Sequence, residues 1–389
     1  MSKISEKNSL KIAFPVSSVW FGALVGPSMI SGAFAASYFA PYGAVGLLLP
    51  FISMGIAAII IAMGAEIVRR EQVYTYSDFA DCIYGGFRKY LTPVLELYMI
   101  IAMVVGGSAV VSMGGVFFSD ISGLPEITGA IAVSAISIVL VLWGEKLVRA
   151  SSSFMSIIMI VGMVLLTVLA VVNRSGDLKN ILLDFSVPRD IPLSAGIAGA
   201  AALGFSNACN ALTLSAVEQE VKTARHCTAI GICSFLLNSM AFILSTLLLL
   251  PYCPEVLKET VPTLAVINQF LAVKAPWLPM VYSVTMFFAL LSSGAPQLHA
   301  VASRVRAVYP KTGILSGNTN RNLVTGVIYF TCCILISRFG LRAIISKGYA
   351  MLGYLAIPLI VLPICVLMPL RYYKMKNSSY LKEGHNETI

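Results

Sequence analysis

The stretch FGALVGPSMISGAF (Phe21–Phe34) is apolar throughout, yet it carries glycine at positions 22, 26 and 32 and proline at position 27. It lies in a run from Ile12 to Ala65 that contains no Asp, Glu, Lys or Arg, which is room for two membrane spans of about 20 residues each. Glycine and proline weaken a helix, and proline also removes a backbone donor. We therefore expect the first span to be interrupted near its middle.

A second stretch, AGAAALGFSNACNALTLS (Ala198–Ser215), has the same peculiarity, with Gly199 and Gly204 followed by Ser206, Asn207 and Asn210. Each interruption lies about ten residues into its span, near mid-membrane at 1.5 Å per residue. A broken helix exposes backbone groups that hydrocarbon does not tolerate unless they line a cavity. Interruptions at matching places in two halves of a chain predict a transporter site. Close helix packing through small residues is the alternative for any single glycine.

The whole chain has the composition of a membrane protein. Its 389 residues are 58% hydrophobic and 12% charged, with a mean hydropathy of +0.85, whereas soluble domains carry about 25% charged residues. After the first run, further stretches lack Asp, Glu, Lys and Arg: Leu97–Ser119, Ile127–Gly144, Ala150–Asn173, Ile191–Val217, Cys227–Pro254, Ala275–Ser303, Asn322–Ser337 and Gly348–Leu370. The sequence predicts an all-α membrane protein of about ten spans.

We expect one transporter domain over residues 15–371, built from two inverted repeats of five spans, about 15–173 and about 191–371. Residues 1–14 and 372–389 are expected to be tails. Most of the 27 Lys and Arg fall in the tails and in alternate loops, which by the positive-inside rule places both termini in the cytoplasm and the chain in the cell membrane. The net charge of +9 is thus explained without nucleic acid.

Two loops are expected to have structure of their own. Tyr74 to Tyr84 places apolar residues at helical spacing with Ser77, Asp78 and Asp81 between them, which is typical of a short interfacial helix. Residues 262–273 (PTLAVINQFLAV) are apolar but too short to span, and are expected to cap an outer vestibule. A connecting helix without function is the alternative for both.

No ionisable side chain lies near the centre of any predicted span. A charged substrate would need a partner there, so the pattern favours a neutral or zwitterionic solute and a coupling ion held by neutral oxygens. Glu66, Glu96 and His299 lie near cytoplasmic ends, where they are either interfacial structural charges or proton relays. The eight cysteines lack metal-ligand spacing, and no span carries a catalytic cluster, so neither an enzyme nor a cofactor is expected.

The eighth predicted span supplies suitable oxygens in MFFALLSSGAPQLHA (Met286–Ala300). Ser292 and Ser293 are adjacent hydroxyls, and Pro296 cannot donate to the Ser292 carbonyl four residues earlier. Hydroxyl and carbonyl oxygens at one place suit a hard cation. A serine pair whose hydroxyls bond back to their own helix is the alternative.

In this pattern the chain resembles the amino acid–polyamine–organocation superfamily, whose members have the LeuT-type fold. The repeated halves with interrupted first and sixth spans carry the resemblance over nearly the whole chain. The interrupted first span, the TYSDFADCIYGG loop (Thr75–Gly86) and YAMLGYLAIPL (Tyr349–Leu359) are most similar to the YkvI-like membrane proteins.

The resemblance implies specific sites. One sodium site would use the carbonyls of Gly22, Val25 and Ala289 with the hydroxyls of Ser292 and Ser293; a second would need an amide where this chain has Met29. A substrate carboxylate would bind just after the first break, where Pro27 departs from the glycine-rich pattern and has no N–H. The implied substrate-binding residues are Pro27, Ser28, Met29, Ser31, Gly107, Ser108, Phe205, Ser206, Asn207 and Asn210.

The predicted function is sodium-coupled symport of a small neutral or zwitterionic solute, such as an amino acid or a related amine, by alternating access. A proton-coupled or exchange porter of the same fold is the first alternative, with His299 or Glu66 as the titrating group. A membrane sensor that binds a solute without moving it is the second.

Overall fold

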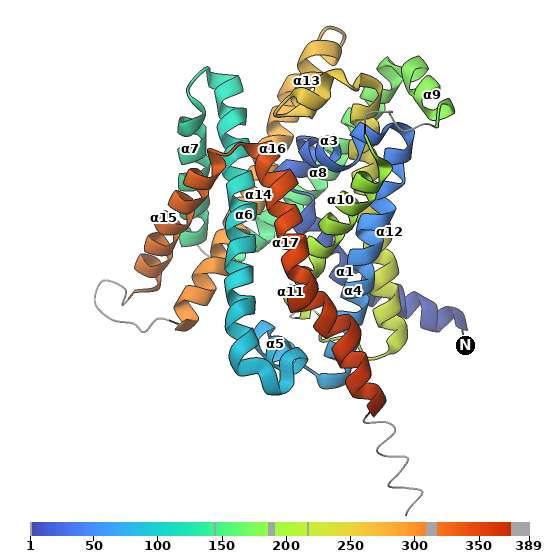
Figure 1. Cartoon of the computed structure of the whole chain (residues 1–389). Coiled ribbons are helices and arrows are strands. Elements are labelled where there is room, and N and C mark those ends of the chain that lie inside the picture. Colours follow the sequence, from blue (N-terminus) through green and yellow to red (C-terminus); the bar gives the residue numbers. More distant parts are fainter. Residues whose placement is uncertain (1, 144, 186–190, 216–217, 309–316, 375–389) are drawn as a thin grey trace, which may run out of the picture.

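A computed structural model describes residues 2–143, 145–185, 191–215, 218–308 and 317–374. Over these ranges the chain is helical and contains no strand, as predicted (Figure 1). The helices of the two halves fold into one bundle whose long axes run between two opposite faces.

The first span is broken where the sequence predicts it. It consists of α1 (Ser2–Leu24), α2 (Pro27–Ile30) and α3 (Ala33–Tyr38). The Gly26 N–H turns back to the Leu24 carbonyl (2.8 Å), and Pro27 has no N–H, so the α-helical ladder stops. The second joint needs glycine, because Gly32 has φ +77° between α2 and α3.

The rest of the first repeat is regular. Two short helices, η1 (Ala40–Leu47) and α5 (Tyr76–Tyr84), flank α4 (Leu49–Glu71), and η2 (Gly85–Phe87) leads into the third span. The other spans of this repeat are α6 (Arg88–Ser122), α7 (Glu126–Trp143) and α8 (Glu145–Asn173), followed by α9 (Ser175–Leu183).

The second repeat has a milder interruption. Its first span is α10 (Leu193–Ser206), a 3₁₀ turn η3 (Asn207–Cys209) and α11 (Asn210–Leu214), and the backbone stays right-handed through the turn. Glycine and asparagine therefore tighten this helix without unwinding it.

The following elements complete the repeat: α12 (Ala224–Leu249), η5 (Leu250–Tyr252), η6 (Glu255–Lys258), α13 (Pro262–Val266), η7 (Ile267–Leu271), α14 (Leu278–Val308) and α15 (Asn318–Ser337). The last span runs through α16 (Leu341–Ala343), η9 (Ile344–Gly348), α17 (Tyr349–Ala356), η10 (Ile357–Val361) and η11 (Pro363–Leu367), and three of these pieces are π-helical.

Each of the ten predicted spans is occupied by helix. By length and composition, seven helices in the described chain can cross a membrane, and an eighth if Ile158–Asn173 and the bent Ser175–Leu183 count as one span. Two shorter apolar helices, Ser9–Leu24 and Glu126–Leu142, fill the remaining places. The ends differ from expectation, since α1 begins at Ser2 and the last helix continues to Lys374; the remainder of the predicted C-tail, 375–389, lies outside the described residues.

The two repeats are inverted relative to each other. The helix between the second and third spans, α5, lies at the bottom of the bundle in Figure 1. The corresponding helix of the second repeat, α13, lies at the top. We name these ends the α5 face and the α13 face. The start of α1 lies toward the α5 face, and so does the end of the last helix, where Arg371 bonds the Cys82 carbonyl of α5 (3.4 Å).

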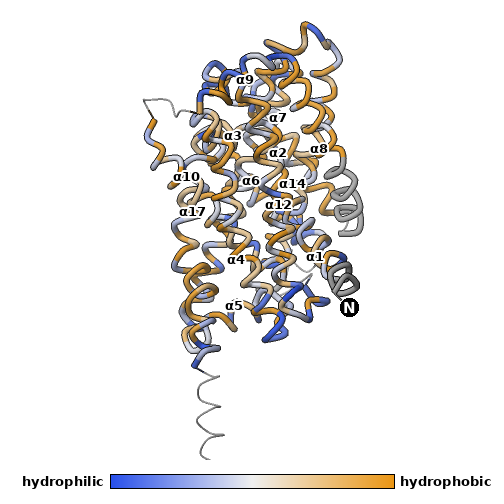
Figure 2. Tube along the Cα trace, turned by 90° about the vertical axis from the view of Figure 1, so that its right-hand side faces the viewer, coloured by the Kyte–Doolittle hydropathy of each residue, from blue (hydrophilic) through white to orange (hydrophobic). Residues whose placement is uncertain are grey.

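The spans form two packed groups. In one, α4 packs on both α10 and α12, and α1 packs on α12; in the other, α6, α7, α14 and α15 pack together. Apolar residues occupy the middle of the bundle and hydrophilic ones gather toward the two faces (Figure 2). Glycines let helices touch, because a methyl group on Gly204 would lie 2.5 Å from the Ser53 carbonyl of α4.

Candidate functional site

A cavity of about 240 Å³ lies between the two groups of spans, at the break of the first span. Five spans line it: Trp20, Ala23, Leu24, Gly26, Pro27, Ser28 and Phe34 from the first; Met99, Ala102, Met103, Gly106 and Val110 from the third; Ser206, Asn207, Cys209, Asn210 and Thr213 from the sixth; Ser293 and Gln297 from the eighth; Tyr349 and Leu352 from the tenth.

The break frees backbone oxygens beside this cavity. The Gly26 N–H bonds to Leu24 and the Met29 N–H bonds to Gly26 (3.1 Å), so within the described backbone neither reaches the carbonyl four residues before it. Those carbonyls belong to Gly22 and Val25, the two that the resemblance implies as ion ligands. Oxygens released in this way need a polar partner when they are buried.

The eighth span approaches the break closely. A methyl group on Gly26 would lie 2.8 Å from the Ser293 hydroxyl oxygen, and Ser293 itself is buried. The Ser292 hydroxyl donates to the Ala289 carbonyl (3.0 Å) and lies 3.7 Å from the Met159 sulfur of α8. Ser293 therefore faces the cavity, and Ser292 faces the neighbouring span.

The sixth span presents amides to the cavity. The Asn207 amide nitrogen donates to the Leu203 carbonyl (2.9 Å), which turns its oxygen toward the Trp20 indole N–H (3.4 Å). The Asn210 amide nitrogen donates to the Asn207 carbonyl (2.9 Å). Each of the two side-chain amide nitrogens therefore donates within the span. The Asn210 side-chain oxygen is left as an acceptor beside the cavity.

The Gln297 side chain of α14 offers a hydrogen-bond donor from the opposite wall of the cavity. The buried Tyr329 hydroxyl lies within hydrogen-bond distance of the Met103 carbonyl (2.8 Å) and the Gln297 side-chain oxygen (3.2 Å). The single hydroxyl hydrogen serves one of these two oxygens at a time, and the Gln297 amide nitrogen is left to donate. A methyl group on Gly106 would lie 3.3 Å from that nitrogen, so glycine there makes room for the amide.

Aromatic side chains seal the cavity toward the α13 face. The Phe34 ring packs edge-on against Tyr349 (5.0 Å between centroids) and Phe242 (5.8 Å). The Tyr38 hydroxyl donates to the Ile345 carbonyl (2.7 Å), and the Thr263 N–H donates to the Ser31 carbonyl (3.0 Å). These bonds tie α3 to the last span and to α13.

The other side is open. Ala23 and Thr213 line the cavity and are exposed, and both belong to the halves of their spans nearer the α5 face. The described conformation is therefore closed at the α13 face and accessible from the α5 face.

Solved structures share this architecture. MhsT in complex with L-phenylalanine aligns with a TM-score of 0.60 at 16% identity, over 91% of this chain and 96% of that one. The inward-facing conformation of Mhp1 aligns with a TM-score of 0.65 at 16% identity, over 90% and 75% of the two chains. The chain has the LeuT-type fold.

A Na⁺-coupled sialic acid symporter in a substrate-bound outward-open state aligns with a TM-score of 0.55 at 11% identity, over 92% of this chain and 85% of that one. No family model matches the sequence, and no curated protein matches it. These likenesses show the LeuT-type fold and leave the amino acid–polyamine–organocation and YkvI-like assignments as predictions.

Within this LeuT-type fold, the structure brings some of the predicted residues together. Pro27, Ser28, Ser206, Asn207, Asn210 and Ser293 line the cavity. Other predicted substrate residues do not: Ser31 bonds its hydroxyl to the Ser28 carbonyl (2.9 Å), Ser108 bonds back to Val104 (2.6 Å), and Gly107 abuts Tyr329 of α15. Met29 is buried and Phe205 packs on the apolar core.

Several lining residues were not singled out by the sequence. Trp20, Met99, Gln297 and Tyr349 reach the cavity because of how their helices are rotated. Among these four residues, only Gln297 could have been predicted from the sequence, because it is a polar residue one helical turn after Ser293 in an apolar span.

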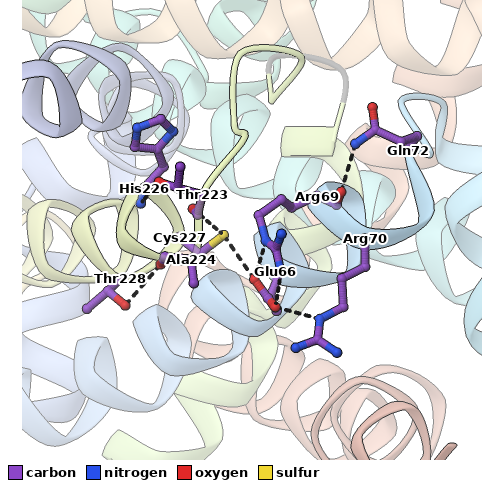
Figure 3. A network of polar contacts seen from close by, with 9 residues as sticks. All are labelled: Glu66, Arg69, Arg70, Gln72, Thr223, Ala224, His226, Cys227 and Thr228. Carbon is purple, nitrogen blue, oxygen red and sulfur yellow. Dashed lines mark hydrogen bonds and ion pairs between the residues drawn. The ribbon is translucent and has the colours of Figure 1, made fainter. Parts of the chain in front are cut away.

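Charge is kept away from the cavity. None of its described lining residues is Asp, Glu, Lys, Arg or His. Near the α5 face, both Arg69 (2.6 and 2.7 Å) and Arg70 (2.6 Å) bond the Glu66 carboxylate, as Figure 3 shows, and Arg304 of α14 lies 3.7 Å from Glu96 of α6. Among the described residues, no three His, Cys, Asp or Glu side chains gather as a metal site.

Proposed function

We propose that this protein is a secondary active transporter that carries a small neutral or zwitterionic solute, such as an amino acid or a related amine, by sodium-coupled symport. The observation that carries the proposal is the cavity at the break of the first span, closed at one face and accessible from the other. A midplane cavity between inverted repeats is the geometry of alternating access.

The lining chemistry supports the substrate class. Amides from Asn210 and Gln297 offer an acceptor and a donor on different walls, and Trp20, Met99 and Phe34 supply apolar surface. With no ionised side chain among the lining residues, a solute of net charge would lose hydration without compensation. Among the structural neighbours, MhsT holds L-phenylalanine.

Sodium coupling is supported by the oxygens at the break. The carbonyls of Gly22 and Val25 lack their helical donors, and Ser293 approaches the same place from α14. With the Ala289 carbonyl, and with the Ser292 hydroxyl turned toward the break, they would make a set of neutral oxygens, which suits a hard monovalent cation. Binding would require the Ser292 hydroxyl to turn from its present position. One structural neighbour is a Na⁺-coupled symporter.

We further infer that the α5 face is cytoplasmic, since the tails and loops there carry most of the Lys and Arg. The described conformation would then be inward-facing. Glu66, one of the groups considered for proton coupling, is neutralised by two arginines and remains an interfacial structural charge in this proposal.

The test is the thermal stability of the purified chain against a panel of amino acids and small amines, each in sodium and in potassium. A ligand of the folded state raises the melting temperature by mass action. We expect a solute that stabilises more in sodium, and we expect Ser292→Ala/Ser293→Ala to abolish that difference.

The matched control is Ser303→Ala, which removes an exposed hydroxyl that bonds back to Ala300 on the same helix (2.8 Å). It should leave the sodium effect intact. Equal stabilisation in both salts would overturn sodium coupling and select a proton-coupled or exchange porter. Binding without uptake into proteoliposomes would select a sensor.

A further inference from the structure

A second cavity lies between α6, α7 and α15, near the α13 face, and the proposed transport cycle does not use it. Its volume is about 180 Å³, against about 240 Å³ for the cavity at the break, and the two have no lining residue in common. Neighbouring residues of α6 face different cavities, since Val110 lines the first and Val111 and Ser112 line the second. The second cavity is therefore a separate feature of the molecule.

Two side chains of opposite charge line this second cavity. Glu126 is the first residue of α7, and Arg338 follows the last residue of α15. Within the described chain, neither the Glu126 carboxylate nor the Arg338 guanidinium forms an ion pair or a hydrogen bond. The next arginine behaves differently, because Arg342 donates to the Lys258 carbonyl (3.2 Å). The cavity thus has an unpaired anion on one wall and an unpaired cation on another.

Backbone contacts set the positions of these two residues. A methyl group on Gly115 of α6 would lie 2.8 Å from the Glu126 carbonyl oxygen, so α6 and α7 touch where α7 begins. Beyond α15, the Gly340 N–H donates to the Ser337 carbonyl (2.9 Å), and Gly340 has φ +85°, which turns the chain toward α16. A ligand between the two charges would therefore meet walls whose backbone is already ordered, which lowers the entropic cost of binding.

The cavity wall also carries a hydroxyl without a partner. Ser112 is 8% exposed, and its hydroxyl forms no hydrogen bond with any described residue. Ser108, one turn earlier on α6, instead bonds back to the Val104 carbonyl (2.6 Å). A buried hydroxyl that lacks a partner is unfavourable, so Ser112 would gain from a polar group placed in the cavity.

The surroundings of the second cavity are apolar. Ile127 lines it and is exposed, and so are Ile131 of α7 and Leu335 of α15 nearby on the same helices. Both helices lie at the outer edge of the bundle (Figure 1), where exposed apolar side chains of a membrane protein face lipid. The cavity is thus placed to receive either a lipid headgroup or a dissolved solute.

We propose that this cavity is a second binding site, for a zwitterion that carries a primary ammonium and a phosphate or carboxylate. The Glu126 carboxylate accepts from the ammonium, and the Arg338 guanidinium donates to the anionic group. The Ser112 hydroxyl bonds the ligand between them. A ligand with a single charge would leave the charge on the other wall unpaired, so the two charges together select a zwitterion. The headgroup of an aminophospholipid and a free amino acid share this chemistry.

The first experiment compares probes that differ in charge. The delipidated full chain is titrated with short-chain phosphatidylethanolamine and with phosphatidylglycerol of the same chain length, by native mass spectrometry, and with radiolabelled glycine, by equilibrium dialysis. We expect saturable binding of a zwitterion, and binding of phosphatidylglycerol about tenfold weaker than that of phosphatidylethanolamine, because phosphatidylglycerol lacks the ammonium. Phosphatidylethanolamine binding identifies a lipid ligand and glycine binding a free one. Equal binding of the two lipids, or saturable binding of neither zwitterion, would overturn the proposal.

The second experiment assigns the binding to this cavity. Glu126→Gln and Arg338→Gln should each weaken binding of the zwitterion about tenfold, since each removes a charge-assisted hydrogen bond, and Ser112→Ala should weaken it several-fold. The matched controls are Glu259→Gln and Arg342→Gln, which alter exposed charges outside the cavity and should bind normally.

Unchanged affinity in both Glu126→Gln and Arg338→Gln would place the ligand elsewhere and overturn the site. Both side chains are exposed, so the variants should fold, and their melting temperatures without ligand check this. Glycine bound at the break would not respond to these substitutions, because that cavity has other lining residues. Failure of the transport proposal would therefore leave both outcomes readable.

Discussion

Gly26 and Ser293 meet so closely that a methyl group at position 26 would lie 2.8 Å from the serine hydroxyl oxygen. The two residues are 267 positions apart: Gly26 lies at the break of the first span, and Ser293 lies within α14 of the second repeat. Gly26 has extended backbone angles (φ −110°, ψ −168°) that any residue can adopt. The contact itself, and not the backbone conformation, therefore requires glycine.

This contact predicts the effect of Gly26→Ala. The added methyl group displaces the Ser293 hydroxyl from the break, and sodium-dependent stabilisation should fall by about tenfold in apparent affinity, equivalent to about 1.4 kcal/mol. The measurement is the melting temperature as a function of sodium concentration. The fold should survive, because a hydroxyl can rotate away.

A double-mutant cycle checks the cause. If the methyl group acts through the hydroxyl, Gly26→Ala should add little to the loss already caused by Ser293→Ala. Fully additive losses would mean that Gly26 acts by another route, and an unaltered sodium response in Gly26→Ala would remove Ser293 from the ion site.

The orientation of Gln297 leads to a second prediction. Tyr329→Phe removes the hydroxyl that lies 3.2 Å from the Gln297 side-chain oxygen, and Gln297→Leu removes the amide donor itself. We expect solute affinity to fall about fivefold and about tenfold, since one hydrogen bond is worth about 1 kcal/mol. Titration calorimetry with the solute identified in the stability panel measures both.

The sodium response distinguishes a loss of solute contact from a loss of the ion site. It should be unchanged in both variants, because Gln297 lies outside the proposed ion ligands. Thr331→Ala, an exposed hydroxyl on the same helix as Tyr329, is the control and should bind solute normally. Wild-type solute affinity in Gln297→Leu would show that this amide does not contact the solute.

The closure of the cavity toward the α13 face leads to a third prediction. The Tyr38 hydroxyl donates to the Ile345 carbonyl (2.7 Å) and joins α3 to the last span. Tyr38→Phe leaves that carbonyl without its donor at a cost of about 1 kcal/mol, which should raise the population open at the α13 face about fivefold. Hydrogen exchange should then quicken in residues 33–47 and 262–271.

Tyr42→Phe is the matched control, because the Tyr42 hydroxyl forms no hydrogen bond among the described residues while its ring packs on Gly196. Its exchange pattern should equal that of the unaltered chain. Equal patterns in all three proteins would mean that the Tyr38 bond does not hold the seal.

The sequence was sufficient for the fold where local chemistry decides the structure. Gly26 and Pro27 in an apolar run predict a break, and the break occurs at those residues. Asn207 and Asn210 are among the substrate-binding residues that the resemblance implies, and both line the cavity. The same residues predicted a full break in the sixth span, but asparagine side chains bond back to their own helix and the backbone only tightens to a 3₁₀ turn.

The rest of the site depends on helix rotation. A step of one residue turns a side chain by about 100°, so Gly106 faces the cavity while Gly107 faces Tyr329. Nothing in a single chain fixes that rotation, because packing against distant helices sets it. Glu218, which lies between α11 and α12 and is 1% exposed, could not be predicted as buried for a similar reason, since the surrounding EQEVK is typical of a solvated loop.

Glu218 leads to the last prediction, the pH dependence of stability. Burial raises its folded pKa to about 8 from an ordinary value of 4.5, so the folded state binds the proton more tightly than the unfolded state. The stabilisation is therefore fully present below pH 4.5 and is lost as the pH rises toward 8, by at most about 1.4 kcal/mol per pH unit.

Glu218→Gln keeps the shape of the protonated acid and does not titrate. The melting temperature of the unaltered chain should therefore fall relative to that of Glu218→Gln between pH 6 and pH 8, and the difference should level off above pH 8. Glu220→Gln should follow the unaltered chain, because its carboxylate is exposed in both states. Parallel melting curves for all three proteins across this range would show that Glu218 is ionised in the folded chain, and the buried carboxylate would then need a partner supplied by water.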